Sequence, residues 1–170
     1  MSISNIVVAD DGSDHAISAL NIAIELALKF DAKLTVVHVL THDHPAEELR
    51  HLVEVEHMAG NGRALTGVAG ASSRDLPVAE VVAEERVIAV LGEQIVKSAR
   101  TKATESGVKN VSSVIQSGDY ANCILEVAKE EGADMIVMGR RGLSNLKGLL
   151  FGSVSQKVSQ RAECSVLTVK

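Results

Sequence analysis

A segment near the carboxyl end of the chain carries the residue types that bind phosphate. Its pattern is Gly-x-x-Gly-x(9)-Gly-Ser, formed by Gly139, Gly142, Gly152 and Ser153. Glycine lets a backbone approach a phosphate closely, and a helix that begins at Ser153 would start with N–H groups that have no acceptor within the helix. Positive charge in the same segment comes from Arg140, Arg141 and Lys147. The segment predicts an anion site, although a solvated loop with helix-capping glycines fits the isolated pattern equally well.

A second polar group follows the first apolar run of the chain. Asp10, Asp11, Gly12 and Ser13 come directly after Ile-Val-Val-Ala at residues 6–9. In open α/β sheets, ligands bind outside the carboxyl ends of the strands, where the strand order reverses. If the first three strands wind one way and the last two the other, the reversal lies between the first and the fourth strand. We then expect the aspartate pair and the glycine segment to face each other across one crevice.

Short apolar runs alternate with helical patterns over most of the chain, which indicates βαβ units and parallel strands. We expect strands at 6–9, 33–40, 108–117, 133–138 and 165–169, and helices at 14–30, 120–131 and 153–161. The strand at 33–40 should be buried on both faces, and Ser13 can cap the first helix. The predicted fold class is α/β: a single doubly wound open sheet of five parallel strands with helices on both faces.

The middle of the chain interrupts this alternation. Residues 45–59 have a helical pattern, and residues 78–107 predict one long helix or two. Between them, residues 60–77 hold four of the 13 glycines, but Leu65 stands where a Gly-x-Gly-x-x-Gly motif would need its third glycine. We expect a flexible connector there. The domain prediction is therefore a single domain, 1–170, with a glycine-rich insertion around 60–77.

Composition narrows the classes of partner. The 170 residues are 46% apolar, and 17 Lys and Arg against 22 Asp and Glu give a formal charge of -5. Such a chain, with one tyrosine, two phenylalanines and no tryptophan, offers no basic patch for nucleic acid and no platform for stacking bases. It has no signal-peptide pattern and no apolar run of membrane-spanning length. We expect a cytoplasmic protein whose Cys123 and Cys164 are reduced packing residues.

The sequence lacks the motifs of several common enzyme classes. The chain has no Walker A sequence, no G-x-S-x-G and no H-E-x-x-H, so no nucleophile with a base beside it is visible and we do not expect an enzyme. A phosphoacceptor receiver domain would also place acids after its first strand, but Asp43 and Lys170 are poorly placed for its other roles. The five histidines between residues 38 and 57 are interpreted as part of a solvated helix and turn rather than a metal site, because no cysteine joins them.

Three stretches of the sequence together resemble the universal stress protein family, in its ATP-binding branch. They are Gly139-x-x-Gly142-x(9)-Gly152-Ser153, the opening Ile6 to Ser13, and Val36-Val37-His38-Val39. The resemblance covers nearly the whole chain. It implies the strand order 3-2-1-4-5, with ATP lying across the first and fourth strands.

The resemblance also implies which residues contact the nucleotide. Ala9, Asp10 and Asp11 match positions beside adenine and ribose, and Val39 matches a main-chain contact to adenine. The first half of the phosphate loop would be Met138, Gly139, Arg141 and Gly142, and its second half would be Gly152, Ser153, Val154 and Ser155. We interpret Ser153 and Ser155 as phosphate-binding hydroxyls at a helix start.

Asp10 departs from the family pattern, in which an uncharged residue is more common. A second carboxylate near a triphosphate should either recruit a divalent cation or weaken binding. We therefore expect ATP to bind with Mg or Mn. Protein ligands alone are not expected to form a metal site, whereas Asp11 could reach the cation of Mg-ATP.

The function expected from these features is that of an ATP-binding stress-response regulator, a nucleotide-dependent sensor or switch. The alternatives are a nucleotide-independent dimeric partner-binding protein of the same fold, a slow ATPase and, more remotely, a receiver domain. The apolar last strand should lie at a sheet edge, and the resemblance implies a homodimer through residues 165–170. The expected partners are an adenine nucleotide and a second copy, with a protein partner left open, and neither nucleic acid nor membrane.

Overall fold

The computed structural model describes residues 2–40, 78–143 and 152–170, and for residues 78–87 it describes the backbone. Several sequence predictions lie outside these residues. They are the helix at 45–59, the glycine-rich insertion at 60–77, four of the five histidines between 38 and 57, and residues 144–151 of the glycine segment.

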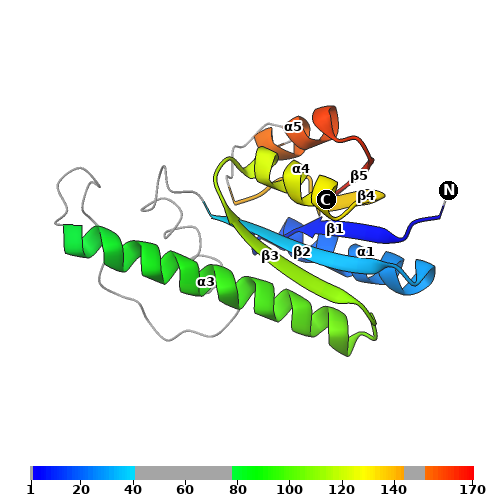
Figure 1. Cartoon of the computed structure of the whole chain (residues 1–170), viewed down its shortest axis with the longest axis horizontal. Coiled ribbons are helices and arrows are strands. Elements are labelled where there is room, and N and C mark those ends of the chain that lie inside the picture. Colours follow the sequence, from blue (N-terminus) through cyan, green and yellow to red (C-terminus); the bar gives the residue numbers. More distant parts are fainter. Residues whose placement is uncertain (1, 41–77, 144–151) are drawn as a thin grey trace.

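Five parallel strands form one sheet, and helices cover both of its faces (Figure 1). The strands are β1 (Asn5–Ala9), β2 (Lys33–Leu40), β3 (Val111–Ser117), β4 (Met135–Gly139) and β5 (Ser165–Val169). Their order across the sheet is β3-β2-β1-β4-β5, and each neighbouring pair is parallel. The predicted doubly wound sheet is confirmed, and its strand order reverses between β1 and β4.

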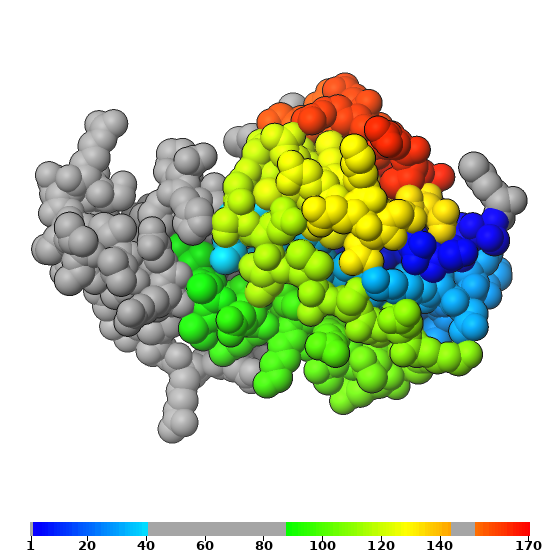
Figure 2. Space-filling view, in the orientation of Figure 1, coloured from blue at the N-terminus to red at the C-terminus, as the bar shows by residue number. Residues whose placement is uncertain are grey.

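The sheet separates two hydrophobic cores. The helices are α1 (Asp14–Phe30), α3 (Val78–Glu105), α4 (Tyr120–Glu130) and α5 (Ser153–Arg161). Ile6, Val8 and Val36 face α1 and α3, whereas Val7 and Val37 face α4 and α5. Alternate residues of β1 and β2 thus enter opposite cores, which is why both strands are apolar throughout. In Figure 2, β3 lies between α3 and α4 on the surface that faces the viewer, and it contacts both helices.

The two cysteines belong to the core between the sheet and α4. Both are free thiols, Cys123 buried and Cys164 half-buried, and burial raises the pKa of each thiol. Neither thiol is activated, which agrees with their predicted packing role.

The β3 and β4 strands begin later than the sequence predicts because the helices before them end in glycine caps. Gly107, with φ 100, follows α3, and the next N–H, that of Val108, bonds back to Ala103 O at 3.1 Å. Gly132, with φ 58, ends α4 in the same way. The apolar residue after each glycine therefore completes a helix cap before the strand starts. The α1 helix begins as predicted, since Ser13 Oγ accepts the first-turn N–H of Ala16.

Candidate functional site

The carboxyl end of β1 continues into a tight turn, residues 10–13, that leads to α1. The N–H of Asp10 bonds to Val37 O of β2 at 2.9 Å, and Asp10 Oδ1 accepts the N–H of Gly12 at 2.9 Å. Asp11 repeats this arrangement one residue later, since its Oδ1 accepts the Ser13 N–H at 3.0 Å. Gly12 supplies the left-handed conformation of the turn, with φ 79. Two overlapping side-chain-to-backbone bonds thus fix the turn's shape.

Asp11 also connects this turn to the glycine segment after β4. Its second oxygen, Oδ2, accepts the N–H of Leu143 at 3.2 Å. A Cβ at Gly142 would overlap the same oxygen, so only glycine allows the two segments to come this close. The aspartate pair and the glycine segment, 132 residues apart in sequence, are therefore adjacent at one edge of the sheet, as the sequence predicts.

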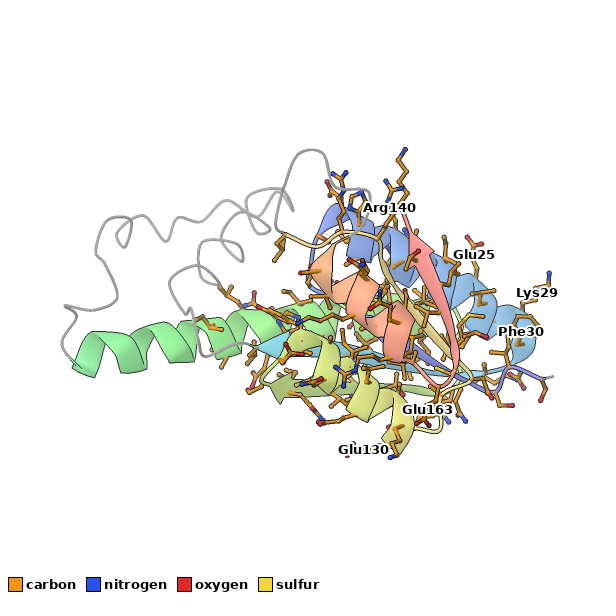
Figure 3. The ribbon with its side chains drawn as sticks, turned by 90° about the horizontal axis from the view of Figure 1, so that it is seen from above. Glu25, Lys29, Phe30, Glu130, Arg140 and Glu163 are labelled. Carbon is orange, nitrogen blue, oxygen red and sulfur yellow. The ribbon has the colours of Figure 1, made fainter. Side chains whose placement is uncertain are left out.

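The two described ends of the glycine segment meet at Arg140. Its carbonyl accepts the N–H of Gly152 at 2.9 Å and the hydroxyl of Ser155 at 2.7 Å, while its own N–H bonds to Val169 O at 2.6 Å. Ser155 is 2% exposed, and its hydroxyl hydrogen already supports the loop, which differs from the phosphate-binding role predicted for this hydroxyl. Figure 3 shows Arg140 beside the start of α1, at the end of that helix opposite Phe30.

The α5 helix starts with backbone donors that no side chain among the described residues caps. Gly152 is the N-cap residue, has extended backbone and makes no side-chain cap bond. Ser153 is exposed and Val154 is half-buried, so the first-turn N–H groups lie at an open helix end. These groups and the helix dipole favour an anion. The second half of the predicted phosphate loop can thus offer three N–H groups and the hydroxyl of Ser153.

The first half of the predicted loop follows directly from β4. Met138 pairs in register with Ala9 of β1, so both strands end at the same edge. A Cβ at Gly139 would lie 2.8 Å from Arg141 O and 3.0 Å from the Cβ of His15 in α1. Gly139 therefore lets the chain leave β4 in direct contact with the first turn of α1.

Val39, the predicted main-chain contact to adenine, lies in β2 next to its last residue. Its side chain packs in the core between the sheet and α4, and in register Val39 is paired with Gln116 of β3. Because the side chain is enclosed, backbone groups are what Val39 can offer to a ligand.

The two aspartates differ in their environments. Asp10 is 5% exposed, and burial raises the pKa of its carboxyl from 3.8 to about 6 against the opposing bond from Gly12. The nearby Asp11 carboxylate raises this pKa further, and Lys102 lowers it. Asp11 is only half-buried and contacts the glycine segment. One of the two neighbouring carboxylates is therefore enclosed, and the other lies at the contact between the two segments. Among the described residues, no three His, Cys, Asp or Glu side chains are arranged to hold a metal ion.

Comparison with known proteins identifies the family. Residues 2–170 match the model of the universal stress protein family. The chain belongs to that family. It is 33% identical over 169 residues to universal stress protein YxiE of Bacillus subtilis, a match that covers 98% of this chain and 99% of that protein.

Solved structures of universal stress proteins share the fold. UspA from Lactobacillus plantarum has a TM-score of 0.73 at 20% identity and covers 100% of this chain and 99% of its own. A universal stress protein in complex with cAMP has a TM-score of 0.64 at 25% identity, and the match covers 100% of this chain and 99% of that protein. Within its described residues, the present universal stress protein has no helix long and apolar enough to cross a membrane.

One buried side chain of this universal stress protein has a role that the sequence analysis missed. His38 of β2 is 3% exposed, and its Nδ1 lies 2.7 Å from the carbonyl oxygen of Asp10. Its grouping with the solvated histidines is therefore wrong. The alternation of side chains along a strand could have shown this, because it puts His38 on the same face as Val36, in a strand expected to be buried on both faces. A buried polar side chain needs a hydrogen-bond partner within the protein.

Proposed function

We propose that this universal stress protein is a stress-response regulator that binds ATP at the edge of the sheet where the turn after β1 meets the glycine segment after β4. The observation that carries the proposal is the Asp11 carboxylate, which contacts both segments at the edge of the sheet where the strand order reverses. Ligands of open α/β sheets bind at such a point. The relative in complex with cAMP, 25% identical to this chain, supports an adenine nucleotide as the ligand class.

We propose that the phosphates and the adenine of the nucleotide bind at different parts of this site. The uncapped start of α5 and the backbone at Gly142 suit the phosphates, because both offer N–H groups or close backbone approach. Ala9 and the main chain of Val39 then lie on the side proposed for adenine. The chain has one tyrosine, two phenylalanines and no tryptophan. It must therefore hold the base through backbone and aliphatic contacts.

A divalent cation fits this site as part of the nucleotide complex. Each Asp11 oxygen accepts one backbone N–H and keeps a second lone pair, and Mg²⁺ commonly takes one carboxylate together with phosphate oxygens. Asp10 is enclosed and bonded to Gly12, which favours Asp11 for this role. Such a cation would neutralise phosphate charge beside the carboxylate. We expect ATP affinity to fall when EDTA replaces magnesium, and equal affinity would exclude the cation from the site.

The proposed role is binding and signalling rather than catalysis. In the described residues at this site, Ser155 donates to a carbonyl and the His38 Nδ1 is engaged with Asp10, so neither pairs with the other as nucleophile and base. The measurement is phosphate release from ATP over hours with magnesium present. Multiple turnovers that disappear in an Asp11→Asn variant would favour the slow ATPase instead.

The binding test is a calorimetric titration of nucleotide-stripped protein with Mg-ATP. A tryptophan at Gly152 would place a large side chain at the uncapped start of α5, so Gly152→Trp should abolish the heat of binding. Ser159→Trp is the matched control, because Ser159 is exposed about two turns further along the same helix. Both variants should keep the far-ultraviolet circular dichroism of the parent protein.

Three outcomes are informative. Micromolar binding that is lost in Gly152→Trp and kept in Ser159→Trp supports the proposed site. Equal loss in both variants would mean that the substitutions act on α5 as a whole and would contradict the local assignment. The absence of heat with ATP, AMP and cAMP under every metal condition would favour the nucleotide-independent partner-binding protein.

A further inference from the structure

The turn that carries Asp11 depends on a contact from a different strand. Asp10 directly follows β1, and its carbonyl oxygen accepts a hydrogen bond from His38 Nδ1 of β2 at 2.7 Å. A carbonyl oxygen is only an acceptor, so Nδ1 must carry the hydrogen. Both residues are at least nine-tenths buried, and a bond in such a place holds its partners firmly because water cannot replace it.

This bond fixes one peptide plane of the turn. The peptide between Asp10 and Asp11 is trans, so its N–H points away from the carbonyl that His38 holds. The same plane fixes the direction of the Asp11 N–H and the position of the Asp11 Cα, from which the side chain starts. Asp11 then contacts Ser13 with one oxygen and Leu143 with the other. A rotated peptide plane would misdirect both contacts.

The other side of the imidazole is fixed by packing. His38 Nε2 is buried and has no hydrogen-bond partner among the described residues. A Cβ at Gly92 of α3 would lie 3.0 Å from His38 Cδ2 and 3.3 Å from Nε2, so the helix backbone passes close to this edge of the ring. Burial lowers the pKa of His38, which keeps the ring neutral near neutral pH. A neutral ring with its only hydrogen on Nδ1 has one hydrogen bond to donate, and it donates that bond to Asp10.

We propose that His38 is a positioning residue of the nucleotide site, which holds the Asp10 carbonyl so that Asp11 is presented to the glycine segment and to the ligand. The expected effect of His38 on nucleotide affinity rests on the proposed function, whereas its effect on the turn at residues 10–13 does not. His38 would act without touching the nucleotide, because its side chain faces α3 from within the sheet.

Two substitutions separate the hydrogen bond from the volume of the ring. In His38→Asn the amide nitrogen can occupy the place of Nδ1 and donate to Asp10, whereas His38→Leu fills the space with no donor. We expect His38→Leu to weaken Mg-ATP binding about tenfold or more and His38→Asn to restore most of the affinity. Amide hydrogen exchange at Gly12, Ser13 and Leu143 should speed up in His38→Leu and stay slow in His38→Asn, with or without nucleotide.

A measurement on the unaltered protein removes the dependence on variants that fold poorly. Nitrogen-15 chemical shifts of the His38 ring should show hydrogen on Nδ1 and none on Nε2 at pH 7. The opposite tautomer would overturn the proposal, as would a folded His38→Leu variant with parental exchange rates and parental affinity. If the parent protein binds no nucleotide while the tautomer and exchange results stand, the proposed function fails and the positioning of the turn by His38 remains.

Discussion

At the scale of single residues, the unusual carboxyl of Asp10 gives the protein a predictable response to pH. Its pKa of about 6 in the fold exceeds the ordinary 3.8, so between these values the folded state holds a proton that the unfolded state has lost. The free energy of unfolding therefore falls as pH rises from about 4 to 6 and stays lower above that range. The fold keeps this carboxyl for its bond to Gly12 despite the cost.

Replacing Asp10 by Asn should remove this pH-dependent cost. Asn retains an acceptor for Gly12 and no longer ionises, so we expect Asp10→Asn to be more stable than the parent at pH 7 by about 1–3 kcal/mol, a gap that closes near pH 4. Urea unfolding at both pH values is the measurement. Asp14→Asn, at an exposed position of α1, should change stability by no more than about 0.5 kcal/mol. A parallel pH dependence in parent and Asp10→Asn would refute the assignment to Asp10.

The two serines at the start of α5 should separate binding from stability. The Ser155 hydroxyl is buried and donates to Arg140, so Ser155→Ala should cost about 1–2 kcal/mol of unfolding free energy. Ser153 is exposed, and Ser153→Ala should leave stability unchanged while weakening Mg-ATP binding roughly fivefold to tenfold, the loss of one hydrogen bond to phosphate. Thermal melts and calorimetry measure the two effects, and a reversed pattern would show that the roles are exchanged.

At the scale of elements, the contact between the end of β4 and the start of α1 depends on Gly139. A methyl group there would meet Arg141 O at 2.8 Å and the backbone of His15 at 3.0 Å, and backbone atoms cannot move aside cheaply. We expect Gly139→Ala to cost about 1–3 kcal/mol of stability and to weaken nucleotide binding as well. Gly152→Ala is the comparison, because its nearest contact would be 3.4 Å. Equal stability of Gly139→Ala and the parent would mean that α1 shifts freely.

At the scale of the whole molecule, β5 lies at one edge of the sheet and can pair with a second copy. Ser165 donates to Asp134 and Val169 accepts from Arg140, so alternate residues of β5 bond to β4 and the N–H of Thr168 points to the open edge. We propose a homodimer through residues 165–170. Edge donors are what such a dimer would use, and proline removes one of them without breaking a bond to β4.

Sedimentation of the parent and of Thr168→Pro tests this dimer. We expect a dimer mass at micromolar concentration for the parent and a monomer mass for Thr168→Pro, with unchanged circular dichroism. A substitution at an exposed position outside β5, Ser106→Ala after α3, should leave the dimer intact. A monomeric parent protein at these concentrations would contradict the proposal.

The sequence by itself determined the sheet and which two segments meet at its edge. Alternating apolar runs and helical periods specify parallel strands, because a strand buried on both faces must be apolar throughout, as β2 is. The glycines at 139, 142 and 152 mark close backbone approaches, and each stands where the fold brings another segment near. The strand starts at Val111 and Met135 were misplaced because an apolar residue after a helix-ending glycine has the same pattern whether it completes a cap or begins a strand.

Only the tertiary structure decided what the polar side chains of the site do. Sequence spacing gave Asp10 and Asp11 one role, but burial and hydrogen bonding place one inside its turn and the other against Leu143. In the same way it assigned the Ser155 hydroxyl to a ligand and His38 to a solvated group, whereas the fold turns both inward. The physical reason is that a polar side chain's role depends on its partners, and these partners come from strands and loops that are distant in the chain.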